Sequence, residues 1–220
     1  LNKRRLHFVG STDLVMCLRI AVLLVLWTAV GGDGTTTLRA ALAVDLSGAA
    51  CDEVLVRLYQ PDSRAQLLRH SPTGKVPVLI TEQGPVWDSL AIAEYLAESY
   101  PEAQLWPAER QARALARSVC AEMHSGFIAL RSHLPMDLAR DQALTELPDD
   151  AQADIDRICA IWAGCRERFA AKGNYLFGPA SIADAFYAPV AARLHWLMNL
   201  RNRLPLLVAP VAGPAIYKSD

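Results

Sequence analysis

The sequence predicts a mixed α/β region followed by an all-helical region. Up to about residue 100, short apolar runs of strand length alternate with helical stretches and glycine-bearing turns. After Pro101 the strand-like patterns stop, and apolar residues recur only at helical spacing. The 220 residues, 52% of them hydrophobic, suffice for one large domain or two modest ones with a buried core. We expect a domain boundary between residues 101 and 107.

Charge and cysteine content narrow the class of protein. The net charge of -1 comes from 22 basic and 23 acidic residues without a polybasic block, so we expect no nucleic-acid partner. An odd number of cysteines without a C-x-x-C pair predicts reduced thiols in the cytoplasm, with neither a disulfide framework nor a metal site. The cysteines are Cys17, Cys51, Cys120, Cys159 and Cys165.

The first 30 residues allow two interpretations. Residues 1–22 show no sustained period and are treated as an unassigned extension. The run 23–28 is continuously apolar, as in a central strand buried on both faces. Alternatively, residues 14–30 form a secretory or envelope-associated segment, although Arg19 leaves too short an apolar run for a transmembrane helix. The cysteine usage favours the cytoplasm.

A glycine loop and a threonine run follow the predicted strand. The sequence G-G-D-G-T-T-T leads into an alanine- and leucine-rich helix at 38–46, which closes at Ser47-Gly48. The loop lacks the third glycine of a dinucleotide fingerprint and the lysine of a P-loop, so a plain turn is the better interpretation. The hydroxyls of Thr35, Thr36 and Thr37 are suited to capping the helix or to binding an anion.

Further elements complete the α/β region before Pro101. They are a strand at 53–59, a short irregular helix at 61–70, a hairpin of strands 76–80 and 85–87, and a helix at 88–99. The predicted order is therefore β-α-β-α-β-β-α.

Three helices are predicted beyond the boundary. Pro107 opens a long helix that runs through Leu130, and a second helix begins at Asp149-Asp150 and stops at Gly173. The third begins at a capping box formed by Ser181 and Asp184. The apolar helical periodicity of this third helix fades after Trp196. The predicted ranges are 23–101 for the α/β domain, 107–197 for the helical domain and 198–220 for an irregular tail.

Four spaced motifs resemble the glutathione S-transferase family, in its serine-type, zeta-like or bacterial subgroup. They are G-K-V-P-V-L (74–79), D-S-L-A-I-A-E-Y-L (88–96), A-E-M-H-S-G-F (121–127) and S-I-A-D-A-F (181–186). The resemblance covers residues 52–189. It implies a thioredoxin-like N-terminal domain followed by a helical domain, a cytoplasmic homodimer, and glutathione as co-substrate without a metal.

The resemblance also implies a glutathione site around Val76-Pro77. That bond is expected to be cis, with the Val76 backbone pairing with the cysteinyl amides of glutathione like an added strand. Ser89, at a helix N-terminus, is expected to bind the γ-glutamyl carboxylate, and Asp88 to face the ligand's ammonium or fix the loop. Lys75 and His70 are candidates for the glycyl carboxylate.

The implied catalytic and electrophile-binding residues lie elsewhere in the chain. Aligning backwards through Arg39 places residues 34–37 over the family's serine loop, with glycine at the usual catalytic position, so Thr35 and then Thr37 are the candidates for stabilising the thiolate. Ser181 and Asp184 are expected to be structural. The predicted electrophile pocket contains Met123, His124, Phe127 and Arg131.

The predicted function is conjugation or isomerisation of small electrophiles by glutathione thiolate, as in detoxification. Since the motifs fade at both ends of the chain, a second hypothesis is a binding or stress-response protein on the same fold without catalysis. A third is an envelope-associated protein that uses residues 14–30. The atypical ends are explained either by altered reading frames or by divergence of a true paralogue.

Overall fold

The computed structural model describes residues 6–11, 34–134 and 147–203. The chain divides into two compact units, Leu1–Trp106 (unit 1) and Pro107–Asp220 (unit 2). Within the described residues, every strand belongs to unit 1. The predicted change from mixed to helical structure is therefore present, and the division falls at the end of the interval 101–107.

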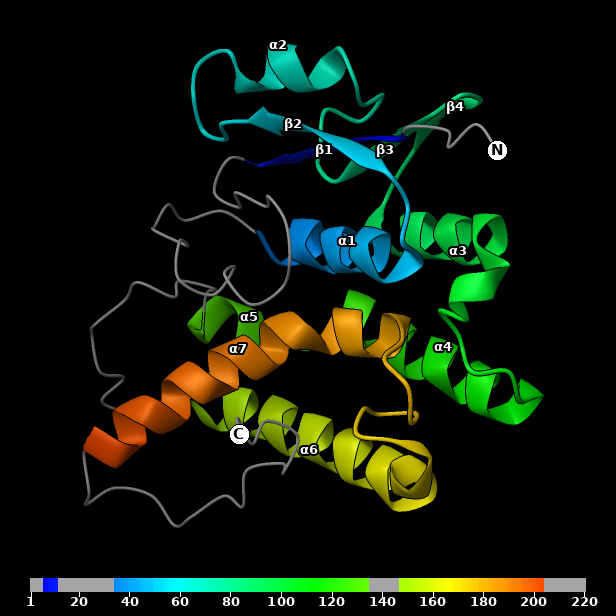
Figure 1. The fold of residues 1–220 in the computed structure, drawn as a ribbon. Helices are drawn as coiled ribbons and strands as arrows, with labels where there is room; N and C mark the ends of the chain where they lie inside the picture. Colours follow the sequence, from blue (N-terminus) through cyan, green and yellow to red (C-terminus); the bar gives the residue numbers. More distant parts are fainter. Residues whose placement is uncertain (1–5, 12–33, 135–146, 204–220) are drawn as a thin grey trace. The chain divides into compact units, whose positions relative to one another are not determined.

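Unit 1 is built on a four-stranded sheet with the order β2-β1-β3-β4 (Figure 1). The strands are β1 (Leu6–Ser11), β2 (Cys51–Val56), β3 (Val78–Thr81) and β4 (Gly84–Val86). β1 pairs in parallel with β2 and antiparallel with β3, which in turn pairs antiparallel with β4. From residue 34 to residue 99, the predicted order α-β-α-β-β-α is confirmed.

The strand between β2 and β3 is an element that the sequence analysis did not predict. β1 lies in the range that the sequence analysis left unassigned, while the predicted strand at 23–28 lies outside the described residues. The segment L-H-F-V-G-S has apolar residues at Leu6 and Phe8 on either side of His7, followed by turn-forming residues. A run of six residues without repeated alternation gives only a weak strand signal.

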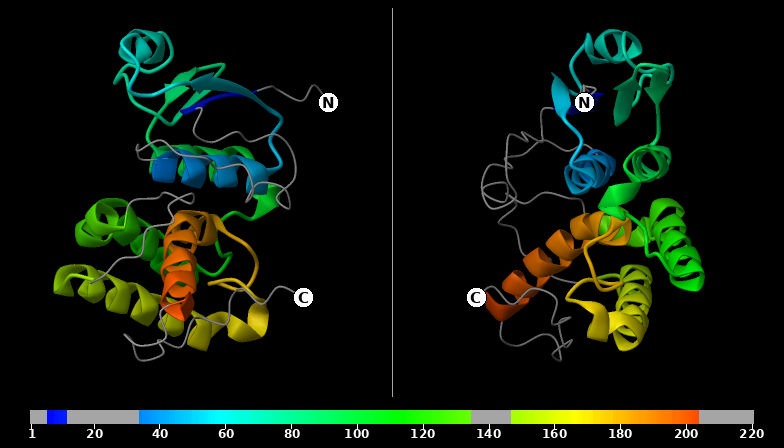
Figure 2. Two further views of the ribbon diagram at one scale, coloured as in Figure 1. Left: turned by 90° about the vertical axis from the view of Figure 1, so that its left-hand side faces the viewer. Right: turned by 45° about the vertical axis from the view of Figure 1, so that its right-hand side comes forward.

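Helices cover both faces of this sheet (Figure 2). On one face, α1 (Gly34–Ser47) packs along α3 (Ser89–Ser99), which is followed by the short helix η1 (Pro101–Ala103). On the other face lies α2 (Ser63–Leu68), where Leu67 is buried against Val56 and Val78. The sheet therefore has a buried layer on each side, as apolar strands require.

Two boundaries in unit 1 differ from the prediction. α1 begins at Gly34, so the three threonines form its first turn and do not precede it. β2 ends at Val56, three residues before the predicted end, because Tyr59 has a φ of 61°. A left-handed backbone at an aromatic residue belongs to a turn and cannot continue a strand.

Unit 2 consists of helices packed in pairs. α4 (Arg110–Ser125) contacts α7 (Ile182–Arg203), and α5 (Ile128–His133) contacts α6 (Asp149–Phe169), which runs into η2 (Ala170–Lys172). The Tyr187 hydroxyl joins α7 to α4 by donating to the Val119 carbonyl at 3.1 Å. The rings of Trp162 and Tyr187 meet edge to face at 5.8 Å. Burial raises the pKa of Tyr187 far above its usual range.

The predicted single helix from Pro107 through Leu130 is wrong at both ends. α4 starts at Arg110 because the Glu109 carboxylate caps it, accepting from the amides of Gln111 and Ala112 at 2.8 and 2.7 Å. These hydrogen bonds lower the pKa of Glu109. The helix stops at Ser125, and the chain reverses at Phe127, whose φ is 56°. Apolar residues keep helical spacing across the break between the two helices, so the spacing alone does not reveal it.

The ends of the last two long helices also differ in detail. Asp149 and Asp150 occupy the first turn of α6, but the residue at its N-cap is Pro148. α7 continues past Trp196 to Arg203, since the first proline of the tail is Pro205. α7 also contains Pro189 in its interior, so neither that proline nor the fading apolar periodicity ends the helix. The tail from residue 204 lies outside the described residues.

Candidate functional site

The predicted glutathione-binding residues lie at one edge of the unit 1 sheet, the edge at which β1 and β2 have their carboxyl ends. Val9 pairs with Val78 in the antiparallel β1–β3 register, so the carboxyl end of β1 lies beside the start of β3. Val76 and Pro77 immediately precede β3, and the bond between them is cis, as predicted. The backbone of Val76 therefore turns at the same edge at which β1 ends.

β4 delivers Asp88 and Ser89 to this edge. Leu79 pairs with Val86, so β4 runs antiparallel to β3 and ends where β3 begins. The chain then passes through a cis Trp87-Asp88 bond into α3. The Asp88 carboxylate caps α3 by accepting from the Leu90 amide at 3.0 Å. An ordinary N-cap role is thus shown for Asp88, alongside any contact with a ligand.

Ser89, the first residue of α3, has an unusual environment. Its side chain is 0% exposed, and its hydroxyl finds no hydrogen-bond partner in the described part of the chain. A buried hydroxyl without a partner carries a free-energy cost. At a helix N-terminus, where amides and the helix dipole favour negative charge, a carboxylate would remove that cost.

The first turn of α1 reaches the same edge. α1 ends three residues before β2 begins, and Cys51 at the start of β2 pairs with Leu6 at the opposite edge. A 14-residue helix spans roughly 21 Å, about the length of these strands, so α1 crosses the sheet and its N-terminus lies beside the end of β1. Thr35 and Thr37 are 0% and 1% exposed, respectively.

The two threonines differ in their hydrogen bonding. Thr35 has a polar partner, whereas the Thr37 hydroxyl, like that of Ser89, makes no hydrogen bond to any described residue. α1 and α3 pack against each other. The sheet edge therefore has two buried hydroxyls with unused hydrogen-bonding capacity, in the first turns of two adjacent helices.

The loop before Val76 is held by its own hydrogen bonds. The hydroxyls of Ser71 and Thr73 are 3.0 Å apart, and the Lys75 amide donates to Ser71 at 3.4 Å. Gly74 takes a φ of 62°, which favours glycine and turns the chain toward the cis bond. The Lys75 side chain is exposed, and His70, at the end of α2, is half-buried. This loop positions Lys75 next to the Val76 backbone.

The predicted electrophile residues cluster around the α4–α5 break of unit 2. Met123 and Phe127 are buried in the core of the unit, whereas His124 and Arg131 are half-buried. The Arg131 guanidinium donates to the Gly126 carbonyl at 2.7 Å and so stabilises the end of α4. These residues are near neighbours in sequence, and Met123, Phe127 and Arg131 contribute to the local structure. Their contact with an electrophile stays a prediction.

The capping-box pair of α7 is fully engaged in the fold. The Asp184 carboxylate accepts from the amides of Leu176 and Ser181, both at 2.9 Å, and from the Ser181 hydroxyl at 2.8 Å. Burial raises the pKa of Asp184, although these hydrogen bonds oppose the shift. Asp184 thereby joins the loop before α7 to the helix, a wider role than a two-residue cap.

The sequence analysis did not consider Ser11, the last residue of β1, as a candidate. Its backbone pairs with Val56 at the carboxyl end of two parallel strands, the edge that carries Val76 and Ser89. Ligands of open α/β sheets bind outside such carboxyl ends. A strand assignment for 6–11 would have identified it, because a serine then follows directly after an apolar strand.

The described ranges meet neither the requirements of a metal site nor those of a membrane-spanning helix. No group of three or more His, Cys, Asp or Glu residues there is arranged to hold a metal ion. None of the helices described is both long and apolar enough to cross a bilayer. The segment 14–30, on which the envelope hypothesis depends, lies wholly outside the described residues.

A thioredoxin-like sheet domain followed by a helical unit is the fold of the glutathione transferases. Residues 23–98 match the family model described as "Glutathione S-transferase, N-terminal domain", a range that begins after β1. A glutathione transferase homolog from Burkholderia gl BGR1, solved with bound glutathione, has a TM-score of 0.56 at 22% identity, covering 94% of this chain and 85% of that one.

Sequence relatives agree with the fold. A probable glutathione transferase of Aplysia californica is 39% identical over 77 residues, which cover 34% of this chain and 80% of that protein. The chain belongs to the glutathione S-transferase family. A probable maleylacetoacetate isomerase of Caenorhabditis elegans is 30% identical over 94 residues, which cover 43% of this chain and only 44% of the isomerase.

Proposed function

We propose that the protein binds glutathione at the sheet edge of unit 1 and uses its thiolate in a transfer or isomerisation reaction of small electrophiles. The observation that carries this proposal is the buried Ser89 hydroxyl, which lacks a partner among the described residues and lies at the N-terminus of α3. A carboxylate there accepts from both the hydroxyl and the helix amides. The γ-glutamyl carboxylate of glutathione supplies that group.

The remaining contacts follow from the same edge. The Val76 backbone, turned by the cis bond, pairs with the cysteinyl part of the tripeptide as an added strand does. Pro77 fixes this turn. Asp88, whose carboxylate caps α3, is the candidate for facing the ligand's ammonium. Lys75, with His70 as the alternative, attracts the glycyl carboxylate.

Calorimetry on the purified chain tests binding directly. We expect the wild type to bind glutathione and Ser89→Ala to bind about tenfold more weakly, the loss of one hydrogen bond to a charged group. Ser118→Ala, an exposed serine of α4, is the matched control and should bind as the wild type does. The site assignment fails if the wild type does not bind or if Ser89→Ala binds unchanged.

Thr37 is the stronger candidate for the hydroxyl that stabilises the thiolate, because its hydroxyl is not already engaged by a described residue. A single well-aimed donor at a developing anion is worth a substantial part of the rate. Thr37→Val should lower kcat with a chlorodinitrobenzene electrophile by more than Thr35→Val does, while both retain glutathione binding. Equal kcat values in both variants and the wild type would assign the role elsewhere, with Ser11→Ala as the next variant.

The isomerase activity is a more specific version of the same proposal. It is favoured by the similarity to the probable maleylacetoacetate isomerase of Caenorhabditis elegans. A thiolate that adds to a cis double bond allows rotation before it leaves, so glutathione is regenerated. Glutathione-dependent isomerisation of maleylacetoacetate by the purified chain is the test. Conjugation activity without isomerisation would leave only the transferase proposal.

The second candidate is a protein that binds glutathione without turnover. It is favoured by the burial of Thr35 and Thr37, which are at most 1% exposed. Retention on glutathione resin together with no conjugation or isomerisation would select it. A cytoplasmic location and a homodimer remain predictions from the family resemblance, and fractionation and sedimentation equilibrium test them. Electrophile contact by Met123, His124, Phe127 and Arg131 is likewise a prediction.

A further inference from the structure

The α2 side of unit 1 carries a concentration of positive charge of which the proposed glutathione site uses only Lys75. Residues 57–75 contain four Lys or Arg residues and a single acid, in a chain whose net charge is -1. We call Arg57, Arg64, Arg69 and Lys75 the basic α2 surface. All four side chains are exposed. One carboxylate of a small ligand would neutralise only a fraction of this charge.

These cations have no acidic partner within the chain as described. None of the ion pairs between described residues includes any of the four. The one acid of the segment, Asp62, instead accepts a hydrogen bond from the Gln66 side chain at 2.6 Å. Charges of one sign held close together without counter-charges attract an oppositely charged partner over about a Debye length.

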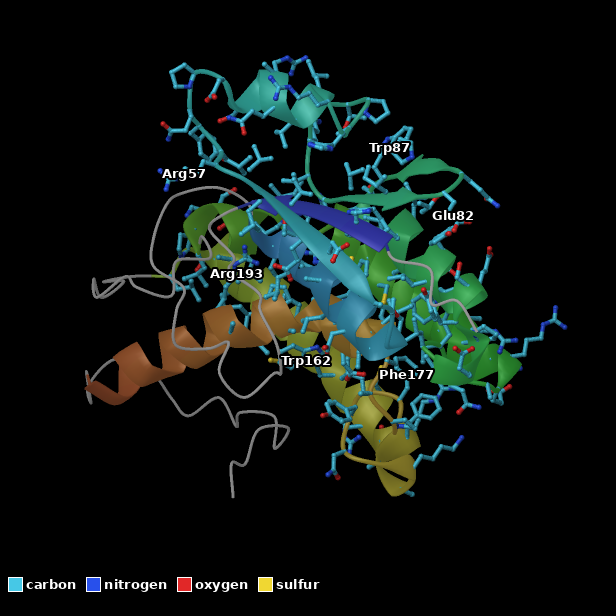
Figure 3. The ribbon with its side chains drawn as sticks, turned by 45° about the horizontal axis from the view of Figure 1, so that its top comes forward. Arg57, Glu82, Trp87, Trp162, Phe177 and Arg193 are labelled. Atoms are coloured by element: carbon cyan, nitrogen blue, oxygen red, sulfur yellow. The ribbon has the colours of Figure 1, made fainter. Side chains whose placement is uncertain are left out.

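Exposed apolar side chains lie among these cations. Tyr59, Leu68 and Trp87 are 68%, 49% and 44% exposed. A Cβ placed on Gly74 would lie 3.3 Å from Leu68 and 3.7 Å from the Arg64 guanidinium, so these two side chains share the surface beside the Lys75 loop. Figure 3 shows Arg57 and Trp87 to the two sides of α2.

Strand alternation places Trp87 on this side of the sheet. Val78 packs into the cluster under α2, and Val86 pairs with Leu79 on the opposite face. Cross-strand partners share a face, and the next residue along a strand faces the other way. Trp87 therefore faces the α2 side, at the end of β4, as Figure 3 also shows. The surface thus combines arginines with tyrosine, leucine and tryptophan.

The combination of arginines with exposed aromatic and aliphatic side chains favours an acidic protein partner over a nucleic acid or a membrane. Arginine, tryptophan and tyrosine are the residues enriched at the energetic centres of protein interfaces. Nucleic-acid binding commonly uses more phosphate contacts than these four cations provide. A membrane surface is usually bound through clusters of basic residues beside an apolar helix face, and α2 has only six residues.

A second copy of the chain is disfavoured by topology. Its most acidic stretch, residues 76–109, has six acids and neither lysine nor arginine, but it centres on α3, on the face opposite α2. Contacts between different faces of identical chains are heterologous, so they propagate head to tail unless the rotation closes a ring. A separate acidic chain encounters no such difficulty.

We propose that the basic α2 surface, with Tyr59, Leu68 and Trp87, docks an acidic, apolar-containing segment of a different protein. Carboxylates of that segment pair with the arginines, and its apolar side chains cover Leu68 and Trp87. Arg57, Arg64 and Arg69 take no part in the proposed glutathione site, so we expect the partner to bind to the free protein as well as to the glutathione complex.

Fluorescence anisotropy with a short thiol-free peptide of alternating glutamate and leucine tests this on the full chain. We expect saturable binding that weakens several-fold between about 0.05 M and about 0.5 M salt. Arg64→Glu combined with Arg69→Glu should weaken it about tenfold. The matched control, Arg110→Glu with Lys172→Glu on unit 2, changes charge equally and should leave the affinity within about twofold of the wild-type value.

Several outcomes overturn the proposal. They are absence of binding, equal binding of the peptide with lysine in place of glutamate, and equal losses in the two double variants. Tighter binding of a single-stranded oligonucleotide or of phosphatidylserine vesicles would assign the surface to another class of partner. Self-association in sedimentation velocity that Arg64→Glu and Arg69→Glu abolish would assign it to a second copy. Trp87→Ala should weaken peptide binding but leave its salt dependence unchanged. This variant separates the apolar contribution from the charge contribution.

Discussion

Ser89 in unit 1 and Asp184 in unit 2 are both polar residues shielded from solvent at a helix N-terminus, yet their hydrogen bonding is opposite. Asp184 accepts three hydrogen bonds, from Leu176 and twice from Ser181. The Ser89 hydroxyl, in contrast, has no partner among the described residues. One group is satisfied by the fold, and the other has bonding capacity left for something that the fold does not supply.

The difference separates a structural role from a binding role by a physical criterion. A polar group shielded from solvent that is fully bonded lowers the free energy of the folded state, and removing it leaves its partners without bonds. A buried polar group without partners costs free energy until a ligand binds. Substitution of the first should therefore reduce stability, and substitution of the second should reduce affinity.

The largest expected effect is on the stability of unit 2. Asp184→Ala should lower the free energy of unfolding by about 3 kcal/mol, because three donors lose a charged acceptor. Urea denaturation followed by circular dichroism measures this. Asp156→Ala is the matched control, since its carboxylate accepts one hydrogen bond, from Gln152, at an exposed position of α6. Comparable losses in the two variants would remove the argument that shielding from solvent distinguishes Asp184.

Ser89→Ala should show the reverse pattern in the same measurements. Its free energy of unfolding without ligand should stay within about 0.5 kcal/mol of the wild-type value, because the variant loses no hydrogen bond. Added glutathione should raise the midpoint of wild-type unfolding by more than that of the variant, since a ligand stabilises the state that it binds. A strongly destabilised Ser89→Ala protein would show that the hydroxyl is structural.

The residues proposed for the glutathione site could be grouped from the sequence because they are close to one another in it. Lys75, Val76, Pro77, Asp88 and Ser89 fall within 15 positions, on a loop, a hairpin and a helix start that each have a strong local signal. The register then brings them to one edge. Local sequence patterns could not predict which hydroxyls have hydrogen-bond partners. Thr35 and Thr37 differ in this respect, and the difference depends on how α1 packs along α3.

The first strand and the α4–α5 break were not predictable for different reasons. β1 is short and gains its stability from pairing with β2 and β3, which are distant in sequence. At the break, Met123, Phe127 and Leu130 keep helical spacing although Phe127 is left-handed. All three side chains are buried. Apolar spacing therefore predicted correctly which residues are buried, but it predicted the wrong backbone conformation.

Asp154 tests the comparison at one hydrogen bond. Its carboxylate, on α6, accepts from the Leu130 amide at 2.9 Å and so supplies the cap that α5 lacks locally. Asp154→Ala should lower the free energy of unfolding by about 1 to 1.5 kcal/mol, between the Asp184 and Asp156 variants. In this variant, hydrogen exchange should be faster than in the wild type, and the increase should be larger in α5 than in α4. Unchanged exchange in α5 would mean that the break is held by Phe127 packing and does not need this cap.

The smallest effect is expected where two hydrogen bonds are exposed to solvent. Glu122 accepts from the Arg157 guanidinium at 2.7 and 2.9 Å, and this pairing raises the pKa of Arg157. Glu122→Gln should lower the free energy of unfolding by only about 0.5 kcal/mol, a difference that shrinks in about 0.5 M salt, because water and ions compensate an exposed pair. Glu122 makes two hydrogen bonds and Asp154 one, so a larger loss in Asp154→Ala would show that shielding from solvent outweighs the number of bonds. The reverse order would make bond number the better guide, and the free Ser89 hydroxyl would then lose its value as a marker of a binding site.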